Sequence, residues 1–520
     1  MHDVEIERYV ERRTPQKQSF QPEGLVLFYV SQERQRRRGI EHESGKRSVR
    51  WKTSRWTKLY GRLQRETLRI NLEREYAQNN ENYETKIIKN VTKKRIASFS
   101  GLRMFHRKRY SFVQNEKDRR NIIYKFTLLQ TIESFHCAIG PVLSIARVFG
   151  LFPVAGVRSV SPSKLQFKTF SFVTFYSGFI ASTIFFMTVV SVLHMVKTLN
   201  ANTIQTRGGI ASATVGAVFY GNSLLGSILF FWLSSRWLPL QSEWRAMERF
   251  RTRSEPTRLR WKFFFLSSVI LVLALIEHIL SMFNNVDGYD WNASNSTFRG
   301  FLETYTLRSH SFIFDTLNYN FAFGLYIFVV SKLATFTWNF TDLFIMLVAT
   351  ALAERYKSLN KKLAVTVTKY RPIFYWRELR EHYAILSCVV KKVDEHISPI
   401  ILLSFANNLY FICLQLLNGL SPLSAVYFFG SFGFLIIRTC AVTLLTARIH
   451  DQSKEALPYL YNCSTSSYGI EAQRLQYQLA TDEVALTGLR FFSITRNFML
   501  AVAGAIITYE VVLLQFVDGK

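Results

Sequence analysis

The stretch FMLAVAGAIITYEVVLLQF, residues 498–516, decides the fold. It is almost wholly apolar and close to the ~20 residues that a helix needs to cross a ~30 Å hydrocarbon core. At about 100° per residue, its small and polar residues share one stripe of such a helix. They are Ala501, Gly504, Ala505, Thr508, Val512 and Gln515. Such a stripe avoids lipid and faces either another helix or water in a pore. The stretch predicts a membrane-spanning helix and leaves these two roles open.

Glu510 is the one charged residue on the rest of this helix. A carboxylate that faces lipid is costly, so we expect it to have a partner within the protein. Arg438, in the preceding apolar run, is the strongest cationic candidate.

Long apolar runs recur from residue 133 onward in this chain of 520 residues, which is 48% hydrophobic and 15% aromatic. That distribution predicts an all-α membrane protein with several spans. The formal charge of +28 would also fit a nucleic-acid-binding protein. Residues 1–132, however, hold 31 Lys and Arg against 15 Asp and Glu, and the rest of the excess lies in loops between the runs. We interpret the charge as membrane orientation and expect no nucleic-acid partner.

Seven apolar runs predict seven transmembrane helices, at residues 170–196, 209–235, 262–284, 318–352, 399–419, 424–446 and 495–516. Loops 237–261, 353–398 and 447–494 hold six, ten and four Lys and Arg, whereas loops 198–208, 285–317 and 420–423 hold one, two and none. Basic loops remain inside, so we expect a cytosolic N-terminus and an external C-terminus. The first thirty residues show no signal-peptide pattern, so the first span is expected to act as the signal.

Two glycosylation sequons begin at Asn292 and Asn295, in a loop that the charge pattern places outside. The five cysteines (Cys137, Cys388, Cys413, Cys440 and Cys463) show neither paired nor metal-ligand spacing, so we expect no disulfide framework and no metal site. Nucleotide-binding, metalloprotease and nucleophile-elbow motifs are missing from the sequence, which predicts no enzymatic activity and no cofactor.

The chain divides into seven predicted regions. Residues 1–123 form a basic, largely disordered cytosolic region that lies near anionic lipid. Residues 124–157, interrupted by glycine and proline, form a re-entrant or membrane-surface helix. Spans one to four occupy 170–352, and a cytosolic helical segment occupies 353–398. Spans five and six occupy 399–446, a cytosolic loop and helix occupy 447–494, and the seventh span occupies 495–516. The fourth span is long enough to project into the cytosol, where amphipathic segments would form a helical layer.

Three motifs carry a resemblance to a known family. The segment TYEVVLLQF, residues 508–516, resembles the terminal signature of insect gustatory receptors. FHCAIGPVL at 135–143 with FGLFPV at 149–154, and WNFTDLF at 338–344, resemble the sugar-receptor branch of that family. Together they span about four hundred residues, from Tyr124 to Phe516.

The resemblance implies a tetrameric cation channel, homomeric or mixed with related receptors, whose long helices meet in a cytosolic anchor layer. It makes the last helix the pore lining, with Val512 as a hydrophobic constriction, Gln515 as the polar ring beside it and Thr508 on the same stripe. A ring of valines closes a pore by dewetting. The family also implies a multi-pass protein of the plasma membrane, in a sensory-neuron dendrite.

A sugar ligand requires hydrogen-bonding groups for its hydroxyls and aromatic faces for its C–H surfaces. The outer halves of spans two to six supply nine candidates: Tyr220, Glu277, His278, Tyr319, Asn320, Asn407, Asn408, Phe411 and Gln415. Few cations stand among them, which favours a neutral polyol over an acid. Each alone is also typical of an interhelical hydrogen bond. Trp338, Asn339 and Asp342 lie deeper in span four, and we assign them to packing or coupling.

We therefore predict a sugar-gated, non-selective cation channel acting as a taste receptor, with its pocket in the outer half of helices two to six and its gate in helix seven. Two alternatives remain. A G-protein-coupled receptor also has seven spans, but the predicted orientation is inverted for that class. A sugar transporter would be expected to show repeated halves with broken helices, and the sequence shows no internal repeat.

Overall fold

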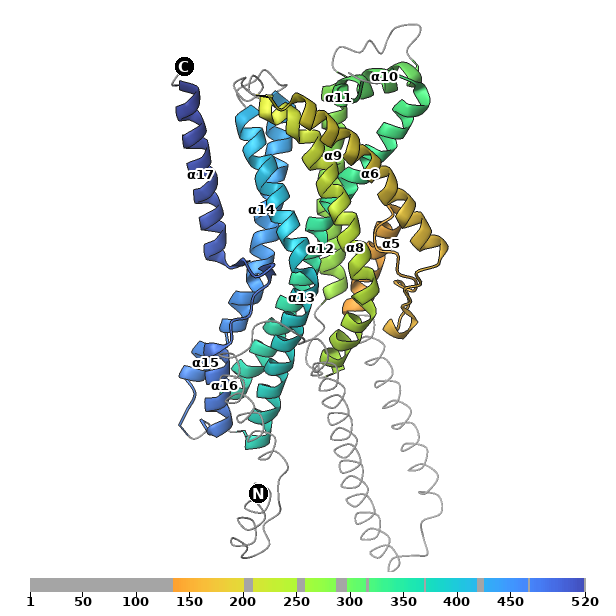
Figure 1. Cartoon of the computed structure of the whole chain (residues 1–520). Coiled ribbons are helices and arrows are strands. Elements are labelled where there is room, and N and C mark those ends of the chain that lie inside the picture. The colour runs from red at the N-terminus through yellow and green to blue at the C-terminus, as the bar shows by residue number, and fades with distance from the viewer. Residues whose placement is uncertain are drawn as a thin grey trace, which may run out of the picture. The chain divides into compact units, whose positions relative to one another are not determined.

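A computed structural model of the chain describes residues 134–200, 209–249, 258–286, 297–314, 318–368, 371–418, 425–465 and 468–518 (Figure 1). The principal helices are α5 (Phe135–Val148), α6 (Phe172–Thr198), α8 (Gly209–Arg249), α9 (Leu259–Asn285), α12 (Phe321–Val367), α13 (Ile373–Asn418), α14 (Ala425–Lys454) and α17 (Arg496–Asp518). Shorter ones are the 3₁₀ turn η1 (Pro162–Lys164) and the helices α10 (Phe298–Ser309), α11 (Ser311–Phe314), α15 (Leu457–Tyr461) and α16 (Ile470–Thr481). One hairpin, β1 (Thr487–Gly488) with β2 (Phe492–Ser493), joins α16 to α17.

Six helices in the described residues are long and apolar enough to cross a membrane: α6, α8, α9, α12, α13 and α14. They coincide with the first six predicted spans, so the multi-pass helical architecture is confirmed. The predicted seventh span forms the 23-residue helix α17. Its crossing of the bilayer stays a prediction, as do the cytosolic N-terminus and the tetramer.

Helices α12 and α13 are much longer than a bilayer requires. They contain 47 and 46 residues, or about 70 Å each at ~1.5 Å per residue, against a hydrocarbon core of about 30 Å. α13 runs without a break through Pro399, so residues 373–398 and the fifth predicted span form one continuous rod. α15 and α16 pack beside the lower ends of these helices (Figure 1). The length of these helices beyond the bilayer thickness is compatible with the expected cytosolic layer, which stays a prediction.

α5 cannot cross a bilayer by itself, because its 14 residues extend only about 21 Å. It is held on one side by the carboxylate of Glu248 in α8, which accepts a hydrogen bond from the Phe135 backbone N–H at 2.9 Å. Arg355 of α12 pairs with the same carboxylate. Phe135 also stacks on Trp244, with ring centroids 3.9 Å apart.

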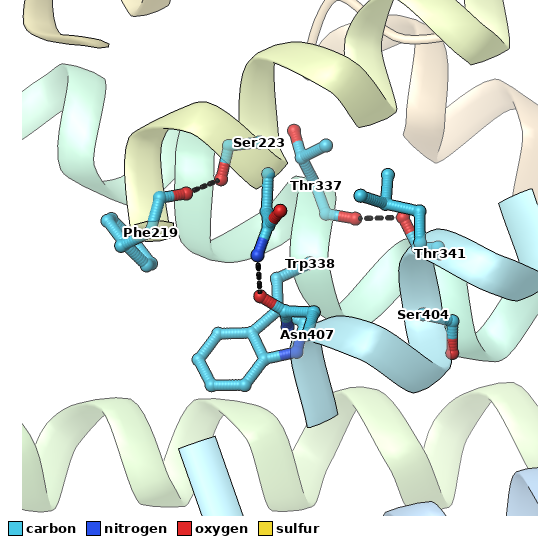
Figure 2. Close-up of a pocket in the computed structure, with 9 residues that line it drawn as sticks. Phe219, Ser223, Thr337, Trp338, Thr341, Ser404 and Asn407 are labelled. Carbon is cyan, nitrogen blue, oxygen red and sulfur yellow. Dashed lines mark hydrogen bonds between the residues drawn. The ribbon is translucent and has the colours of Figure 1, made fainter. Parts of the chain in front are cut away.

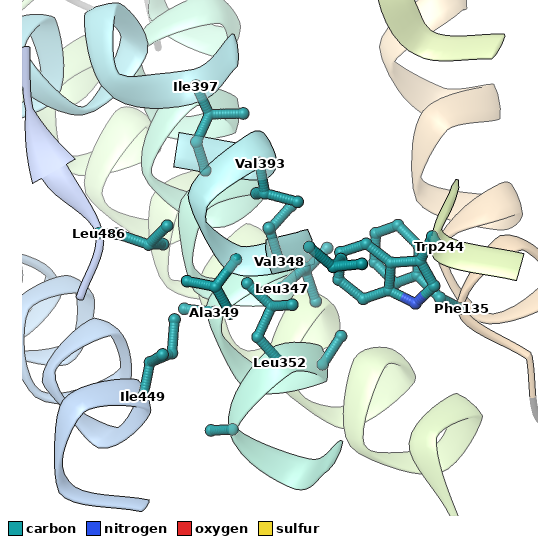
Figure 3. Close-up of a cluster of buried hydrophobic side chains, with 14 of the residues drawn as sticks. Phe135, Trp244, Leu347, Val348, Ala349, Leu352, Val393, Ile397, Ile449 and Leu486 are labelled. Atoms are coloured by element: carbon teal, nitrogen blue, oxygen red, sulfur yellow. The ribbon is translucent and has the colours of Figure 1, made fainter. Parts of the chain in front are cut away.

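The core is centred on α12. Every residue from Asn339 to Tyr356 is buried, on all sides of the helix. A helix with this pattern is enclosed by other helices. Figure 3 shows Leu347 and Leu352 between Ile449 and Leu486 on one side and the Phe135–Trp244 pair on the other.

α6 shows the opposite pattern. Only six of its 27 residues are buried, and Phe175, Phe179 and Phe185 stand 77%, 62% and 55% exposed. Apolar surface on this scale is typical of a helix that faces lipid.

Several predictions fall outside the described residues. They include the character of residues 1–123 and the glycosylation of Asn292 and Asn295. The side chains of Glu510, Val512 and Gln515 also lie outside the description, although the backbone of α17 passes through these positions.

Candidate functional site

A small cavity lies where α8, α12 and α13 meet (Figure 2). It is lined by Phe219, Asn222, Ser223, Thr337, Trp338, Thr341, Leu403, Ser404 and Asn407. The lining combines two amides, four hydroxyls and two aromatic rings, and none of its side chains is ionisable at neutral pH. About 10 Å³ is open to the centre of a water molecule, so the cavity has room for roughly one water.

A side-chain hydrogen bond between two lining residues joins α8 to α13 at the cavity. Asn222 Nδ2 donates to Asn407 Oδ1 at 2.7 Å (Figure 2). Ser223 Oγ donates to the Phe219 carbonyl at 2.8 Å and to the Ala334 carbonyl of α12 at 3.2 Å. Gly226 allows α8 to approach α12, because a Cβ there would stand 3.0 Å from Thr337 Cγ2.

A buried ion pair lies next to the cavity. Arg438 Nε of α14 is 2.9 Å from Asp342 Oδ2 of α12, and their side chains are 2% and 0% exposed. Asn408 Nδ2 donates to Asp342 Oδ2 at 3.0 Å, and Ser404 Oγ donates to the other carboxylate oxygen. Arg438 also donates to the amide oxygens of Asn339 and Asn408. Arg438 thus pairs with Asp342. Its predicted pairing with Glu510 is not tested, because the Glu510 side chain lies outside the described residues.

Trp338 joins the cavity to this ion pair. Its Nε1 donates to Asn408 Oδ1 at 3.2 Å, and the Arg438 guanidinium lies 4.5 Å from its ring centroid. Phe411 stacks on the same ring at 4.6 Å. Cation–π contact of this kind stabilises a desolvated guanidinium by about 2 kcal/mol. α12, α13 and α14 are therefore fastened together at one depth, directly beside the cavity.

The nine predicted ligand residues separate into three groups. Asn407 lines the cavity, and Asn408 and Phe411 lie behind it with Trp338 and Asp342. The helix face that the sequence assigned to packing or coupling, Trp338 to Asp342, thus lies with the predicted ligand face of α13.

The second group joins α9, α13 and α14. Gln415 Nε2 donates to Ser431 Oγ at 3.1 Å, and Ser431 Oγ donates to Glu277 Oε1 at 3.0 Å. His278 follows on α9, and its Nε2 is buried without a hydrogen-bond partner among the described residues. None of these residues is in the cavity lining.

The third group lies near α10 and α11. Tyr220 is buried and its hydroxyl is 2.6 Å from His310 Nε2. Tyr319 packs against Phe314, with centroids 5.8 Å apart, and over Gly324. Asn320 is exposed and caps α12 by accepting from the Ala322 N–H at 3.0 Å. A helix-capping role explains Asn320 without a ligand.

Phe219, Ser223, Thr337, Thr341 and Leu403 are cavity residues that the sequence analysis did not select. The serine and threonine hydroxyls donate to carbonyls of their own helices, which is their ordinary behaviour in apolar helices. Nothing in their local sequence distinguished them. The available signal was the i, i+4 spacing of Thr337 and Thr341 beside Trp338.

The described part of the small stripe on α17 is exposed. Ala501, Gly504, Ala505 and Thr508 are exposed, and a Cβ on Gly504 would meet nothing within 4 Å. Thr508 Oγ1 donates only to the Gly504 carbonyl, at 2.9 Å. These four residues of the stripe are therefore not packed against a described helix of the same chain.

The chain shares the helical fold of an insect olfactory receptor. The structure of the olfactory receptor OR5 from Machilis hrabei superposes with a TM-score of 0.54 at 16% identity, covering 73% of this chain and 97% of that one. Its complex with eugenol gives 0.53 at 14% identity, with the same coverage.

The sequence comparisons are more specific. A family model described as "Trehalose receptor" matches residues 105–520. Two Drosophila melanogaster proteins are each 34% identical. "Gustatory receptor for sugar taste 64f" aligns over 420 residues, 78% of this chain and 86% of that protein. "Gustatory receptor 5a for trehalose" aligns over 398 residues, 74% and 86%. The chain belongs to the trehalose receptor family, the sugar branch of the insect gustatory receptors. Its members are receptors, which confirms the prediction that the chain is not an enzyme.

Proposed function

We propose that this chain is a taste receptor of the plasma membrane, a sugar-gated, non-selective cation channel whose ligand binds in the cavity between α8, α12 and α13. The cavity lining carries the proposal. Amides, hydroxyls and aromatic rings without an ionisable group suit a neutral polyol, whose hydroxyls require donors and acceptors and whose C–H faces require rings. The names of the relatives, which include sugar taste and trehalose, support the same class of ligand.

A sugar must enlarge this cavity in order to enter it. The room for one water molecule is far below the volume of a monosaccharide. Entry requires the Asn222–Asn407 hydrogen bond to open, and both amides then become available to sugar hydroxyls. The sugar binds only the state in which α8 and α13 have moved apart. A ligand with this preference shifts the population toward that state.

The pore is proposed to form around α17 in a homotetramer or a heteromer with related receptors. An exposed stripe of small residues on an otherwise apolar helix is expected to face water or a neighbouring subunit. Val512 would form the constriction and Gln515 the polar ring, with Thr508 one turn away on the same stripe. Cations pass when the valine ring widens and wets.

Recording from cells that express this chain alone tests the proposal. Trehalose and a panel of mono- and disaccharides should evoke a cation current within milliseconds and without added nucleotide. Thr341→Val removes a cavity hydroxyl at nearly constant volume, and the loss of a neutral hydrogen bond of ~0.5–1.5 kcal/mol should raise the half-maximal concentration about 2- to 13-fold. Thr350→Val, a buried threonine of the same helix outside the cavity, is the control.

The alternatives make different predictions. A G-protein-coupled receptor would give a delayed, nucleotide-dependent response, and a transporter would accumulate sugar without a channel current. If sugar evokes a current but Thr341→Val leaves the dose–response unchanged, the channel proposal stands. The cavity is then not the ligand site.

A further inference from the structure

Three phenylalanine rings join the base of α17 to α13. Phe492 of β2 stacks on Phe498 of α17, with centroids 4.5 Å apart and planes 7° from parallel. Phe405 of α13 contacts both rings edge-on, at 5.9 Å from Phe492 and 5.3 Å from Phe498. Phe405 is 8% exposed. We call these three residues the aromatic clasp.

The hairpin that carries Phe492 is bound to α13 by two hydrogen bonds. Asp394 Oδ1 accepts from the Thr487 backbone N–H at 2.6 Å, and Asp394 Oδ2 accepts from Thr487 Oγ1 at 2.8 Å. On the other side, Arg496 at the start of α17 pairs with Asp451 of α14 at 2.7 Å. The base of α17 is therefore held by both helices.

The hairpin backbone is shaped to bring Phe492 inward. Leu489 and Arg490 have φ angles of 48° and 64°, which side-chain-bearing residues rarely adopt. Gly488 lies directly under the Phe492 ring, and a Cβ there would stand 2.3 Å from its Cζ. Only glycine at 488 leaves room for the ring. Such conformations persist where the surrounding contacts determine them.

Phe405 lies in the same helical turn of α13 as residues that line the cavity. Ser404 and Asn407 of the same helical turn line the cavity, and Ser404 also donates to Asp342. Successive side chains of a helix point about 100° apart, so this turn of α13 has the cavity and the ion pair on one side and the clasp on another. A displacement of the turn moves both sets of contacts together.

Above its base, much of α17 is exposed, with one further apolar contact at Ile506. Leu500 and Ile507 are 69% and 64% exposed. Higher on the helix, Ile506 packs against the cluster around Phe411 and Leu435. The clasp and Ile506 are two apolar contacts between α17 and the buried clusters of the described helices.

We propose that the aromatic clasp transmits sugar binding to the pore: Phe405 moves with the cavity wall and carries Phe492 and Phe498, and with them the base of α17. This rests on the function proposed above. The three residues are positioning residues, since none touches the ligand or the pore axis. On this proposal, Ile506 moves with α17 and slides over the cluster around Phe411 and Leu435.

The test uses the full chain expressed alone, with trehalose as the probe and two measurements. One is trehalose-evoked current divided by surface protein, and the other is the thermal stabilisation of purified receptor by trehalose. Phe405→Ala should lower the current at least tenfold, while trehalose still stabilises the protein. Gly488→Ala, which displaces the Phe492 ring without altering α13, should give the same result. Phe374→Ala, at an exposed phenylalanine of α13, is the matched control and should behave as wild type.

The two single variants should not add, because Phe405 and Phe492 act as one unit. Phe405→Leu retains the burial without the ring and should give an intermediate current if Phe405→Ala does not reach the surface. Wild-type current in Phe405→Ala and Gly488→Ala would overturn the clasp, and so would a larger loss in Ile506→Ala than in Phe405→Ala. If neither Phe405 variant reaches the surface, the clasp is a folding element and the proposal is wrong. A wild-type chain that gives no sugar-evoked current overturns the proposed function, and the clasp with it.

Discussion

The ion pair of Asp342 and Arg438 is buried and makes hydrogen bonds to several neighbouring side chains. Both side chains are out of water, and each is bonded to amides or hydroxyls from α12 or α13. A buried pair adds little net stability when compared with apolar replacements, but removal of one partner leaves an unpaired charge. We infer that the pair fixes how α12, α13 and α14 fit together beside the cavity.

Removal of one partner should therefore cost more than removal of both. Asp342→Asn or Arg438→Met alone is expected to destabilise the fold by about 3–5 kcal/mol, since the remaining ion stays buried without its partner. The double variant Asp342→Leu/Arg438→Met should recover most of this loss. Surface expression and the melting temperature in detergent measure the effect. A double variant less stable than either single one would contradict the argument.

The sequence predicted residues of α13 at the candidate site, but it did not select most of the residues that line the cavity on the other helices. Asn407, Asn408 and Phe411 share one local stretch, so a single helix was enough to group them. Glu277 and Gln415 were expected beside them, but they meet through Ser431 on α14. Depth along a helix can be counted from residues, whereas the direction a side chain faces turns by about 100° per residue and depends on how the helices are packed.

Among the elements, the helices themselves were the most predictable feature. Their apolar lengths are local properties, and six predicted spans coincide with long helices. The continuation of α13 through Pro399 was not predicted, because proline usually interrupts a helix. The β1–β2 hairpin was also unpredicted. Its strands have two residues each, and its turn uses positive φ at Leu489 and Arg490.

A buried charged contact joins α16 to α13 beside the apolar packing of α16. Glu471 is 4% exposed and accepts from Arg380 of α13 at 2.8 Å and from Arg474 at 2.9 Å. Burial alone would raise the pKa of the Glu471 carboxyl, but the two arginines outweigh burial and hold this pKa below its ordinary value of 4.5. A carboxyl whose pKa is lowered by folding stabilises the protein above its unfolded pKa, and this contribution is lost as pH falls through the folded pKa.

Glu471→Gln should accordingly lower the melting temperature at pH 7. The difference from wild type should shrink below pH 4.5 and vanish once the wild-type carboxyl is protonated. Melting curves of the purified receptor between pH 7 and pH 3.5 provide the measurement. A difference that is the same at every pH would show that Glu471 acts through packing and not through its charge.

α17 carries the gate prediction. Val512→Ala should widen the proposed constriction and raise the current that flows without sugar. Smaller side chains leave a wider, less apolar opening, which fills with water more readily. Gln515→Ala should change conductance or ion preference and leave the sugar dose–response near wild type. Single-channel recording distinguishes these effects. Wild-type behaviour of both variants would place the pore elsewhere.

For the whole molecule, orientation is the property that separates the proposed channel from the other seven-span class. The basic loops predict a cytosolic N-terminus and an external C-terminus. An epitope tag fused after Lys520 should be stained on intact cells, and a tag ahead of Met1 should be stained only after permeabilisation. The reverse pattern would contradict the channel topology.

The small volume of the cavity has a consequence for how the receptor would detect and rank sugars. With room for roughly one water molecule, every sugar faces the same cost of parting α8 from α13 before it makes any contact of its own. On the proposed mechanism, that cost lowers the apparent affinity for all sugars by one common factor. Threshold and preference are then separate traits: substitutions that ease the parting change the lowest concentration detected, and substitutions in the lining change the ranking of sugars. A species could adjust its receptor to a richer or poorer diet while keeping the same order of sweetness.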